Sequence, residues 1–484
     1  MVGIPSVDTL SVPIEIQSPV AADLAAKKIS KQAIRTSLKA STLDGVFATI
    51  FSNIAGGVLL INFLLQLGAT PVEIGFLSSI PMVMNFLQPL GAYFADRTQS
   101  RRNYIRTLVG LSRLLWLVLV ALIALYSWFN TDPHLLVTST LIIIFICNIL
   151  NALGCSAWLS WMAVLVPQGI RGRYFGFRNS AVSLTNLLVV PLLGFAVSAL
   201  PGDIISGYGV LLIVGVAIGL VSLGCQGWMT DVNPVSSPCV DSQAQQQESD
   251  NQPEISILKD TNFLKFLLYV GLWMFAVNLS SPFFNLYMMK NLALDLSTVT
   301  VYTSLVSGAN IVMLRFWGKL ADRIGNRPLL LLVGIPIAIT PVLWFGIGAD
   351  SVSVWVWLPL MYLFWGGFGD AIDLCYNNLQ MSLASENRRP SKYFALTAAV
   401  SGVGGGLGST MGGFLAGLDI TGGLLGLFAL SAIVRLIALL PLVFVHEKHS
   451  QPVFQVLRNL LPFKPEQVEA IGEQKPEVIV ALVK

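Results

Sequence analysis

One charged pattern occurs twice in this chain, as Ala92-Tyr93-Phe94-Ala95-Asp96-Arg97-Thr98-Gln99-Ser100-Arg101-Arg102 and as Gly318-Lys319-Leu320-Ala321-Asp322-Arg323-Ile324-Gly325-Asn326-Arg327. Each copy follows a long apolar segment and precedes another. A segment that recurs at the same place in each half of an apolar chain indicates an internal duplication. We therefore expect a membrane protein built from two related halves.

The composition indicates that much of the surface lies in lipid. Of the 484 residues, 54% are hydrophobic and 11% are charged, whereas a soluble protein carries about 25% charged residues. The net charge of +3 is too small to indicate a nucleic-acid partner. The five cysteines form no Cys-x-x-Cys pair and the three histidines lie outside the apolar segments. Neither a metal site nor a cofactor is therefore expected.

The apolar segments predict an all-α membrane protein with twelve transmembrane helices in two pseudo-symmetric six-helix bundles. A spanning helix needs about 20 mostly apolar residues, and lipid leaves the backbone no water to bond. The first six predicted spans are 44–67, 72–95, 103–126, 135–166, 174–200 and 204–229. The second six are 262–289, 297–320, 328–347, 352–383, 391–418 and 422–445.

Basic residues predict the orientation, because they precede the first span and gather in alternate connections after it. The positive-inside rule places these connections and both termini in the cytoplasm, and we expect the membrane to be the plasma (inner) membrane. The predicted division is a cytoplasmic tail at 1–42, a bundle at 43–229, a polar linker at 230–261, a bundle at 262–446 and a cytoplasmic tail at 447–484.

The second charged segment reads Gly-x-x-x-Asp-Arg-x-Gly-x-Arg. With two six-helix halves and a polar central loop, it resembles the major facilitator superfamily over about residues 40–446. The resemblance implies a secondary active transporter, not an enzyme, that moves a small organic solute across the lipid bilayer by alternating access. It also implies that the first, fourth, seventh and tenth spans line a central cavity, and that the chain can work as a monomer.

By this resemblance the two segments hold the cytoplasmic side shut. The implied gating residues are Asp96, Arg97, Arg101, Gly318, Asp322, Arg323, Gly325 and Arg327. A carboxylate gains from the dipole at a helix N-terminus, so Asp96 would meet the start of the eleventh span near Lys392, and Asp322 the start of the fifth near Arg173. The alternative is that these charges only anchor the loops. The first copy lacks both glycines of the pattern, which predicts a looser gate there.

The tenth span carries the sharpest local pattern. Asp370, Asp373, Asn377 and Gln380 are spaced three, four and three residues apart, which places them on one helical face. A charged carboxylate at that depth costs roughly 3 kcal/mol. Two readings compete: an aspartate couples proton movement to the substrate or binds a cationic group, or it pairs with an intramembrane arginine and fixes packing. Arg435 is the expected partner by depth, and Arg113 is the weaker choice.

Amide and aromatic side chains recur in the other spans expected to line the cavity. The candidate substrate contacts among them are Asn148, Asn151 and Trp158 in the fourth span and Trp273 and Asn278 in the seventh. Each one taken singly also suits ordinary packing. Seven glycines in the eleventh span indicate close helix packing.

The expected activity is secondary active transport, and no Gly-x-x-x-x-Gly-Lys loop for ATP is present. The acids and aromatic groups favour proton-coupled export of a small molecule, with protons as the coupling ion. A proton-coupled importer is the alternative. A non-transporting scaffold of the same architecture, or a lipid- or pigment-handling protein, stays open as a different class.

Overall fold

The computed structural model describes residues 30–98, 100–129, 132–166, 171–199, 204–231, 260–385, 390–418 and 422–447. Every regular element in these ranges is a helix. Most of the predicted linker and both predicted tails lie outside the described residues, so the domain boundaries remain a proposal.

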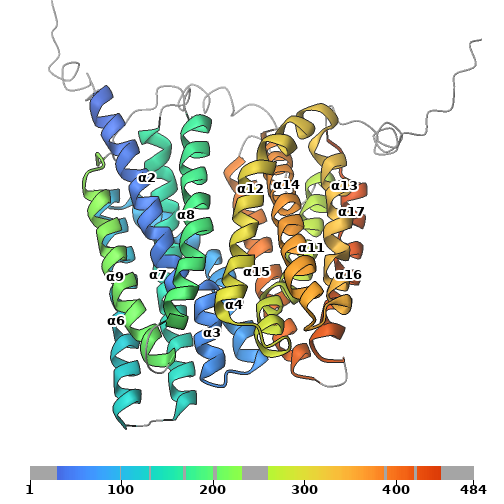
Figure 1. Cartoon of the computed structure of the whole chain (residues 1–484). Coiled ribbons are helices and arrows are strands. Elements are labelled where there is room, and N and C mark those ends of the chain that lie inside the picture. The colour runs from blue at the N-terminus through green and yellow to red at the C-terminus, as the bar shows by residue number, and fades with distance from the viewer. Residues whose placement is uncertain are drawn as a thin grey trace, which may run out of the picture.

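The helices of the first half stand together at the left of Figure 1, in blue to green. They are α2 (Lys31–Ile54), α3 (Gly57–Gln66), α4 (Pro71–Met84), η1 (Asn85–Leu87), α5 (Gln88–Asp96), α6 (Arg101–Phe129), α7 (Pro133–Leu165), α8 (Arg171–Ala199) and α9 (Ile204–Gly227). Spans 1 and 2 are each built from more than one helix, because α2 is followed by α3 and α4 by η1 and α5.

The second half forms the group at the right of Figure 1, in yellow to red. Its elements are α11 (Thr261–Lys290), α12 (Leu296–Ile324), α13 (Asn326–Ile339), η5 (Thr340–Gly346), η6 (Ser353–Trp357), α14 (Leu358–Ser385), α15 (Pro390–Ala416), α16 (Gly423–Ala438) and α17 (Leu440–Val443). The described ends of the chain, Ser30 and Glu447, lie at the same side of the molecule (Figure 1). We name that side the terminal face and the other the opposite face.

The elements give twelve spans in two bundles of six. Within the described ranges, nine of them are long and apolar enough to be recognised by length and hydropathy alone. The other three correspond to the bent α4–η1–α5, the acid-bearing α14 and the glycine-rich α15. The first predicted span starts too late: α2 begins at Lys31, and Asp44 is a buried residue in its middle.

Two pairs of helices join the halves: α4 packs against α15, and α8 packs against α12. The glycines of α15 allow this packing on two faces, as the sequence predicted. A Cβ added to Gly404 would lie 2.6 Å from the carbonyl oxygen of Gly271 in α11, and one added to Gly402 would lie 2.6 Å from that of Met82 in α4. The backbones are therefore in direct contact across the boundary between the halves.

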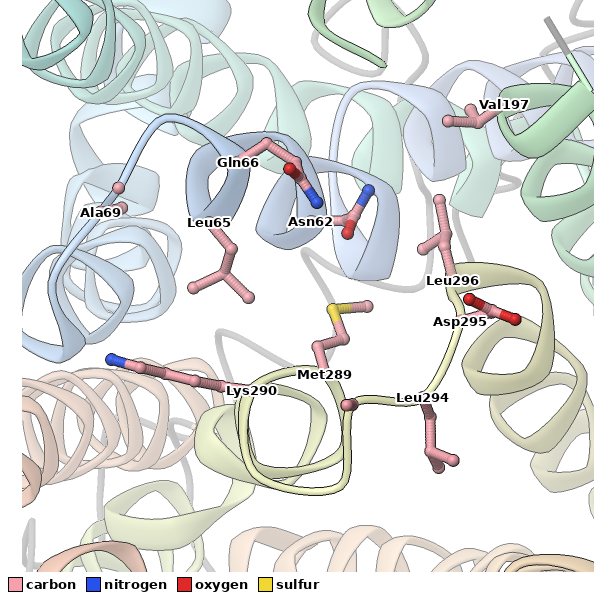
Figure 2. A pocket seen from close by; sticks show the side chains of 12 residues that line it. Asn62, Leu65, Gln66, Ala69, Val197, Met289, Lys290, Leu294, Asp295 and Leu296 are labelled. Atoms are coloured by element: carbon pink, nitrogen blue, oxygen red, sulfur yellow. The ribbon is translucent and has the colours of Figure 1, made fainter. Parts of the chain in front are cut away.

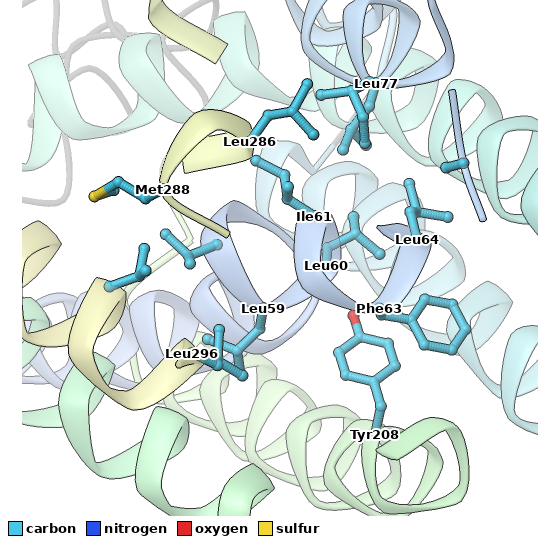
Figure 3. Close-up of a cluster of buried hydrophobic side chains, with 14 of the residues drawn as sticks. Leu59, Leu60, Ile61, Phe63, Leu64, Leu77, Tyr208, Leu286, Met288 and Leu296 are labelled. Carbon is cyan, nitrogen blue, oxygen red and sulfur yellow. The ribbon is translucent and has the colours of Figure 1, made fainter. Parts of the chain in front are cut away.

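The buried side chains show where the halves are closed. One cluster, which we name the sealing cluster, joins the halves near the opposite face; Figure 3 shows its Leu59, Leu60 and Phe63 from α3 with Leu286 and Met288 from α11 and Leu296 from α12. Toward the terminal face two separate clusters replace it, one within each half. The halves are thus sealed by apolar side chains at the opposite face and lack a shared core at the terminal face.

Each half also contains a buried arginine that ties together three of its helices. Arg113 in α6 bonds the Gly219 carbonyl and, at 3.2 Å, the Ser222 hydroxyl in α9. Ser222 in turn donates to the Asp44 carboxylate of α2. These bonds join spans 1, 3 and 6.

In the second half, Arg435 of α16 donates to the carbonyls of Ile337 in α13, at 3.1 Å, and Val277 in α11, at 3.3 Å. It also donates to the Ser280 hydroxyl at 2.9 Å. These bonds join spans 7, 9 and 12. The expectation that Arg435 or Arg113 pairs with an aspartate of the tenth span is therefore wrong, because both guanidinium groups are engaged elsewhere.

Candidate functional site

A large cavity of about 1080 Å³ lies between the halves on the terminal side of the sealing cluster. Its walls come from α4, η1 and α5 of the first half and from α11, α14 and α15 of the second. Four amides line it: Asn85, Gln88, Asn377 and Gln380. The volume is that of a site for a drug-sized molecule.

The sequence-predicted face of α14 leads from this cavity into the bundle. Asn377 and Gln380 line the cavity, and Asp373 lies one turn deeper on the same helical face. The Asp373 side chain is exposed, and Asp370, almost one further turn in, is half-buried. Neither carboxylate has a hydrogen bond or ion pair to any side chain that the structure describes. Two acids within a spanning helix, on the face that continues inward from a cavity wall, are suited to bind a proton or a cationic group.

Two tyrosines that the sequence analysis did not single out lie beside these acids. Tyr376 lines the cavity and interacts electrostatically with Asp373. Tyr269 of α11 is also within electrostatic reach of Asp373, and its buried hydroxyl has no hydrogen-bond partner within the described structure. The Tyr269 ring stacks on Trp273, with 6.1 Å between the ring centroids. Trp273 is thus a buried support behind the acids.

A second cavity, of about 410 Å³, lies in the first half where span 1 is broken. Both predicted amides of span 4, Asn148 and Asn151, line it, together with Gly56 and Gly57. Gly57 has φ +57°, a left-handed conformation that glycine adopts without strain. The break separates α2 from α3 in mid-membrane, where irregular backbone is tolerated only if it is buried in protein or lines a cavity.

The broken backbone is partly satisfied from α9. The Tyr208 hydroxyl donates to the Ile54 carbonyl at 2.8 Å, and the Tyr208 ring stacks on Phe63 of α3 at 4.5 Å between centroids. Tyr208 is 1% exposed, so no water replaces this hydrogen bond. This contact fixes the direction in which α3 leaves the break.

The remaining predicted contacts are not gathered around the acids. Trp158 lies under the Arg178 guanidinium, at 4.8 Å from the ring centroid. The Asn278 amide donates to the Met274 carbonyl of its own helix at 2.8 Å. The structure separates the predicted set by position: Asp370, Asp373, Asn377 and Gln380 share one face of α14, Asn148 and Asn151 line the second cavity, and Trp158, Trp273 and Asn278 line neither of these two cavities.

Only part of the predicted gate lies among the side chains that the structure describes. The side chains of Asp96, Asp322, Arg173 and Lys392 are not among the described ones. Arg97 lies over the Tyr93 ring at 4.2 Å. A Cβ at Gly318 would meet nothing within 4 Å, so this glycine makes no close helix contact in this conformation.

Other groups of the charged segments act within their own half. Arg327 donates to the Leu442 carbonyl at 3.2 Å, at the end of span 12, and its backbone N–H donates to Glu447 at 2.8 Å. Arg102 donates to the Met229 carbonyl at 3.2 Å, at the end of span 6, and its N–H faces Asp231 at 3.4 Å. The same device thus occurs in both halves.

In this repeated device an arginine binds carbonyls at the end of the half's last helix, and an acid beyond that helix caps the start of another. Of the other predicted members, Arg101 is buried and Arg323 is exposed. Gly325 ends α12 with φ +94°. The gating role of the set stays a prediction.

A third pocket, of about 510 Å³, opens on the opposite face above the sealing cluster. Figure 2 shows Asn62 and Gln66 from the first half facing Met289 and Leu296 from the second, with Asp295 at the side. The acids of α14 do not line it. We name it the vestibule; it is separate from the cavity beside the acids.

The structure thus consists of two bundles of six spans, sealed at one face and with a large cavity toward the other. The family model of the Major Facilitator Superfamily matches residues 45–395, and the chain belongs to this family. It is an integral, multi-pass membrane protein that acts on small-molecule substrates, and the family and its structural neighbours point to a transporter rather than an enzyme.

Solved structures share this fold. A D-xylose–proton symporter superposes with a TM-score of 0.65 at 16% identity, covering 87% of this chain and 98% of the other. A bacterial homologue of the iron transporter ferroportin in an inward-facing state gives 0.63 at 14% identity, covering 85% and 98%. The nucleoside transporter NupG gives 0.62 at 12% identity, covering 85% and 100%. No curated protein sequence matches the chain.

Proposed function

We propose that this chain is a proton-coupled secondary transporter that exports a small organic solute by alternating access. The observation that carries the proposal is the pair of acids in α14, Asp370 and Asp373, whose helical face continues into the cavity between the halves. Protonation neutralises these acids. A charged, unoccupied pair of acids is less stable when the cavity is closed and water is excluded than when it is open to water, so proton binding shifts the balance between the two conformations.

The proposed orientation follows from the positive-inside rule. The terminal face carries the basic connections of the chain and is assigned to the cytoplasm. The described conformation is then open toward the cytoplasm and sealed by α3, α11 and α12 toward the outside. In this state the site accepts the solute from inside and releases protons there. In the alternative, import with a proton, the solute and the proton bind together from the opposite face and are both released at the terminal face.

The test begins by finding a ligand. A thermal-shift screen of the purified full chain against pooled metabolites and drugs selects a compound, whose movement is then measured in proteoliposomes with and without an imposed pH gradient. We expect the gradient to drive the compound across the membrane against its own concentration gradient. The double variant Asp370→Asn/Asp373→Asn should lose this driven transport.

The matched control is Asp295→Asn, which removes a carboxylate from the vestibule at the opposite face and should leave driven transport intact. Full driven transport by the double variant would exclude the acids as the coupling site. A compound that binds but is never moved, at any gradient, would identify a scaffold instead.

A further inference from the structure

The walls of the large cavity combine aromatic rings with amides, and none of the described residues that line it is charged. Four rings line it: Phe86, Tyr93, Tyr376 and Phe394. Three of them, Phe86, Tyr93 and Phe394, are exposed, with 60%, 51% and 37% of their surface accessible. Such a wall binds a large apolar body, and ring faces also attract cations.

The negative charge beyond this wall has no compensating charge among the described side chains. Asp373 and Asp370 follow Asn377 inward on the same helix, and the buried Arg435 of α16 is bonded to the carbonyls of Ile337 and Val277. The two acids therefore lie on the face of α14 that continues inward from Asn377, just beyond the residues that line the cavity.

In the first half, two arginines lie over aromatic rings: Arg97 over Tyr93 of the cavity wall, at 4.2 Å from the ring centroid, and Arg178 over Trp158. Arg178 donates to the Ser41 carbonyl at 3.4 Å. It also interacts electrostatically with the buried Asp44. The first half therefore offers no free positive charge from Arg178 for an anionic group of a ligand.

An unused donor lies behind the acids. The Tyr269 hydroxyl is buried, with the residue 1% exposed, and has no hydrogen-bond partner among the described groups. A buried hydroxyl without a partner costs free energy. A ligand atom or a reoriented Asp373 carboxylate that accepts a hydrogen bond from this hydroxyl would therefore be favoured. The ring below it, Tyr376, faces the cavity and stacks on Phe266 at 5.9 Å between centroids.

We infer that the substrate class is an organic cation with an aromatic or branched apolar body. The body lies against the rings of Phe86, Phe394 and Tyr376, and the cationic centre lies toward Asp373 and Asp370. A hydrophobic cation needs an apolar wall with an acid within reach, and here Asp373 lies one turn inward of the cavity-lining Asn377 on the same face of α14. The inference rests on the proposed function, since it names the solute that the same site would move.

The test is equilibrium binding of radiolabelled tetraphenylphosphonium to the purified full chain in detergent, where no gradient exists and no transport is needed. We expect saturable binding that neutral triphenylphosphine oxide does not compete away. Asp373→Asn should weaken binding roughly tenfold or more, because the attraction between the carboxylate and the phosphonium charge is lost, while Asp373→Glu should largely retain it. Tyr376→Leu should weaken binding several-fold, and Tyr376→Phe should not.

The control is again Asp295→Asn, and each variant is checked by its elution profile and melting temperature. Equal competition by the neutral compound, or unchanged binding in Asp373→Asn, would overturn the inference. Loss of binding in Arg178→Gln as complete as in Asp373→Asn would also overturn it, by assigning a zwitterion. Cation binding without gradient-driven transport would leave this inference standing and refute the proposed function, so the two failures are distinguishable.

Discussion

A wedge between the halves tests whether they rock as alternating access requires. Gly75 of α4 lies near the opposite face, where α4 meets α15. A Cβ added there would lie 2.7 Å from the Ser409 carbonyl oxygen and 3.1 Å from the Gly413 Cα, both backbone atoms. Because backbone cannot rotate away as a flexible side chain can, Gly75→Ala should push the halves apart at the sealed face.

The magnitude follows from the contact. Overpacking of this kind costs about 1–3 kcal/mol, and each 1.4 kcal/mol is about a tenfold change in an equilibrium constant. If the cost falls on the described conformation alone, the balance between the two conformations should shift by roughly five- to 150-fold toward the one open at the opposite face.

The assay is labelling of single cysteines by a membrane-impermeant maleimide, in a background without the native cysteines. The reporter for the opposite face is Leu296→Cys, a member of the sealing cluster that is 8% exposed. The reporter for the terminal face is Leu90→Cys, which lines the large cavity and is 47% exposed. With Gly75→Ala, labelling at Leu296→Cys should rise while labelling at Leu90→Cys falls.

The matched control is Gly224→Ala in α9, where an added Cβ meets nothing within 4 Å. It gives the same gain in helix propensity, about 1 kcal/mol, without a wedge, and should leave both labelling rates unchanged. A Gly75→Ala protein with a lower melting temperature but no opposite changes in labelling at Leu296→Cys and Leu90→Cys would show that the halves do not rock about this contact.

Three smaller predictions follow from single contacts. Tyr208→Phe should lower the free energy of unfolding by about 1–3 kcal/mol, because the buried Ile54 carbonyl at the break loses its donor; a denaturant titration measures it. Glu447→Gln should cost about 1 kcal/mol, since it weakens the charged cap at the start of α13, and an unchanged melting temperature would contradict the capping role. Hydrogen bonds from Ser353 hold the pKa of the exposed Asp350 below its ordinary value. The stability they confer is therefore present above the unfolded-state pKa and lost as pH falls through the folded one, and Ser353→Ala, which removes the hydroxyl bond but keeps the backbone N–H bond, should reduce that acid-side dependence of the melting temperature.

The architecture was predictable because lipid forces apolar segments to be helical and because the charged segment recurs in each half. The breaks were not predicted. Hydropathy averages over a window about as long as a span, so it does not register that Gly57 takes a positive φ or that a 3-10 turn interrupts span 2 at Asn85–Leu87. The adjacent glycines Gly56 and Gly57 in an apolar run were the available signal.

The face of α14 was predictable for a similar reason, because spacing along one helix fixes which residues share a face. Contacts between helices were not, because they depend on how each helix is rotated and how deep it sits. Arg435 was expected to meet an aspartate at similar depth, but its guanidinium points toward α11 and α13 instead. Likewise Tyr269 gave no signal of its own, since its importance comes from a hydroxyl left without a partner beside another helix.

The most direct test of proton-coupled alternating access measures distances across both faces of one protein in lipid nanodiscs. Spin labels at Asn62 and Ala293 report the opposite face, and labels at Leu90 and Phe394 report the large cavity. Proton-coupled alternating access predicts that a change from acid to alkaline pH shifts the two distance distributions in opposite directions. It also predicts that Asp370→Asn/Asp373→Asn abolishes this shift. A single distance on each face, unchanged by pH or by the acids, would contradict it.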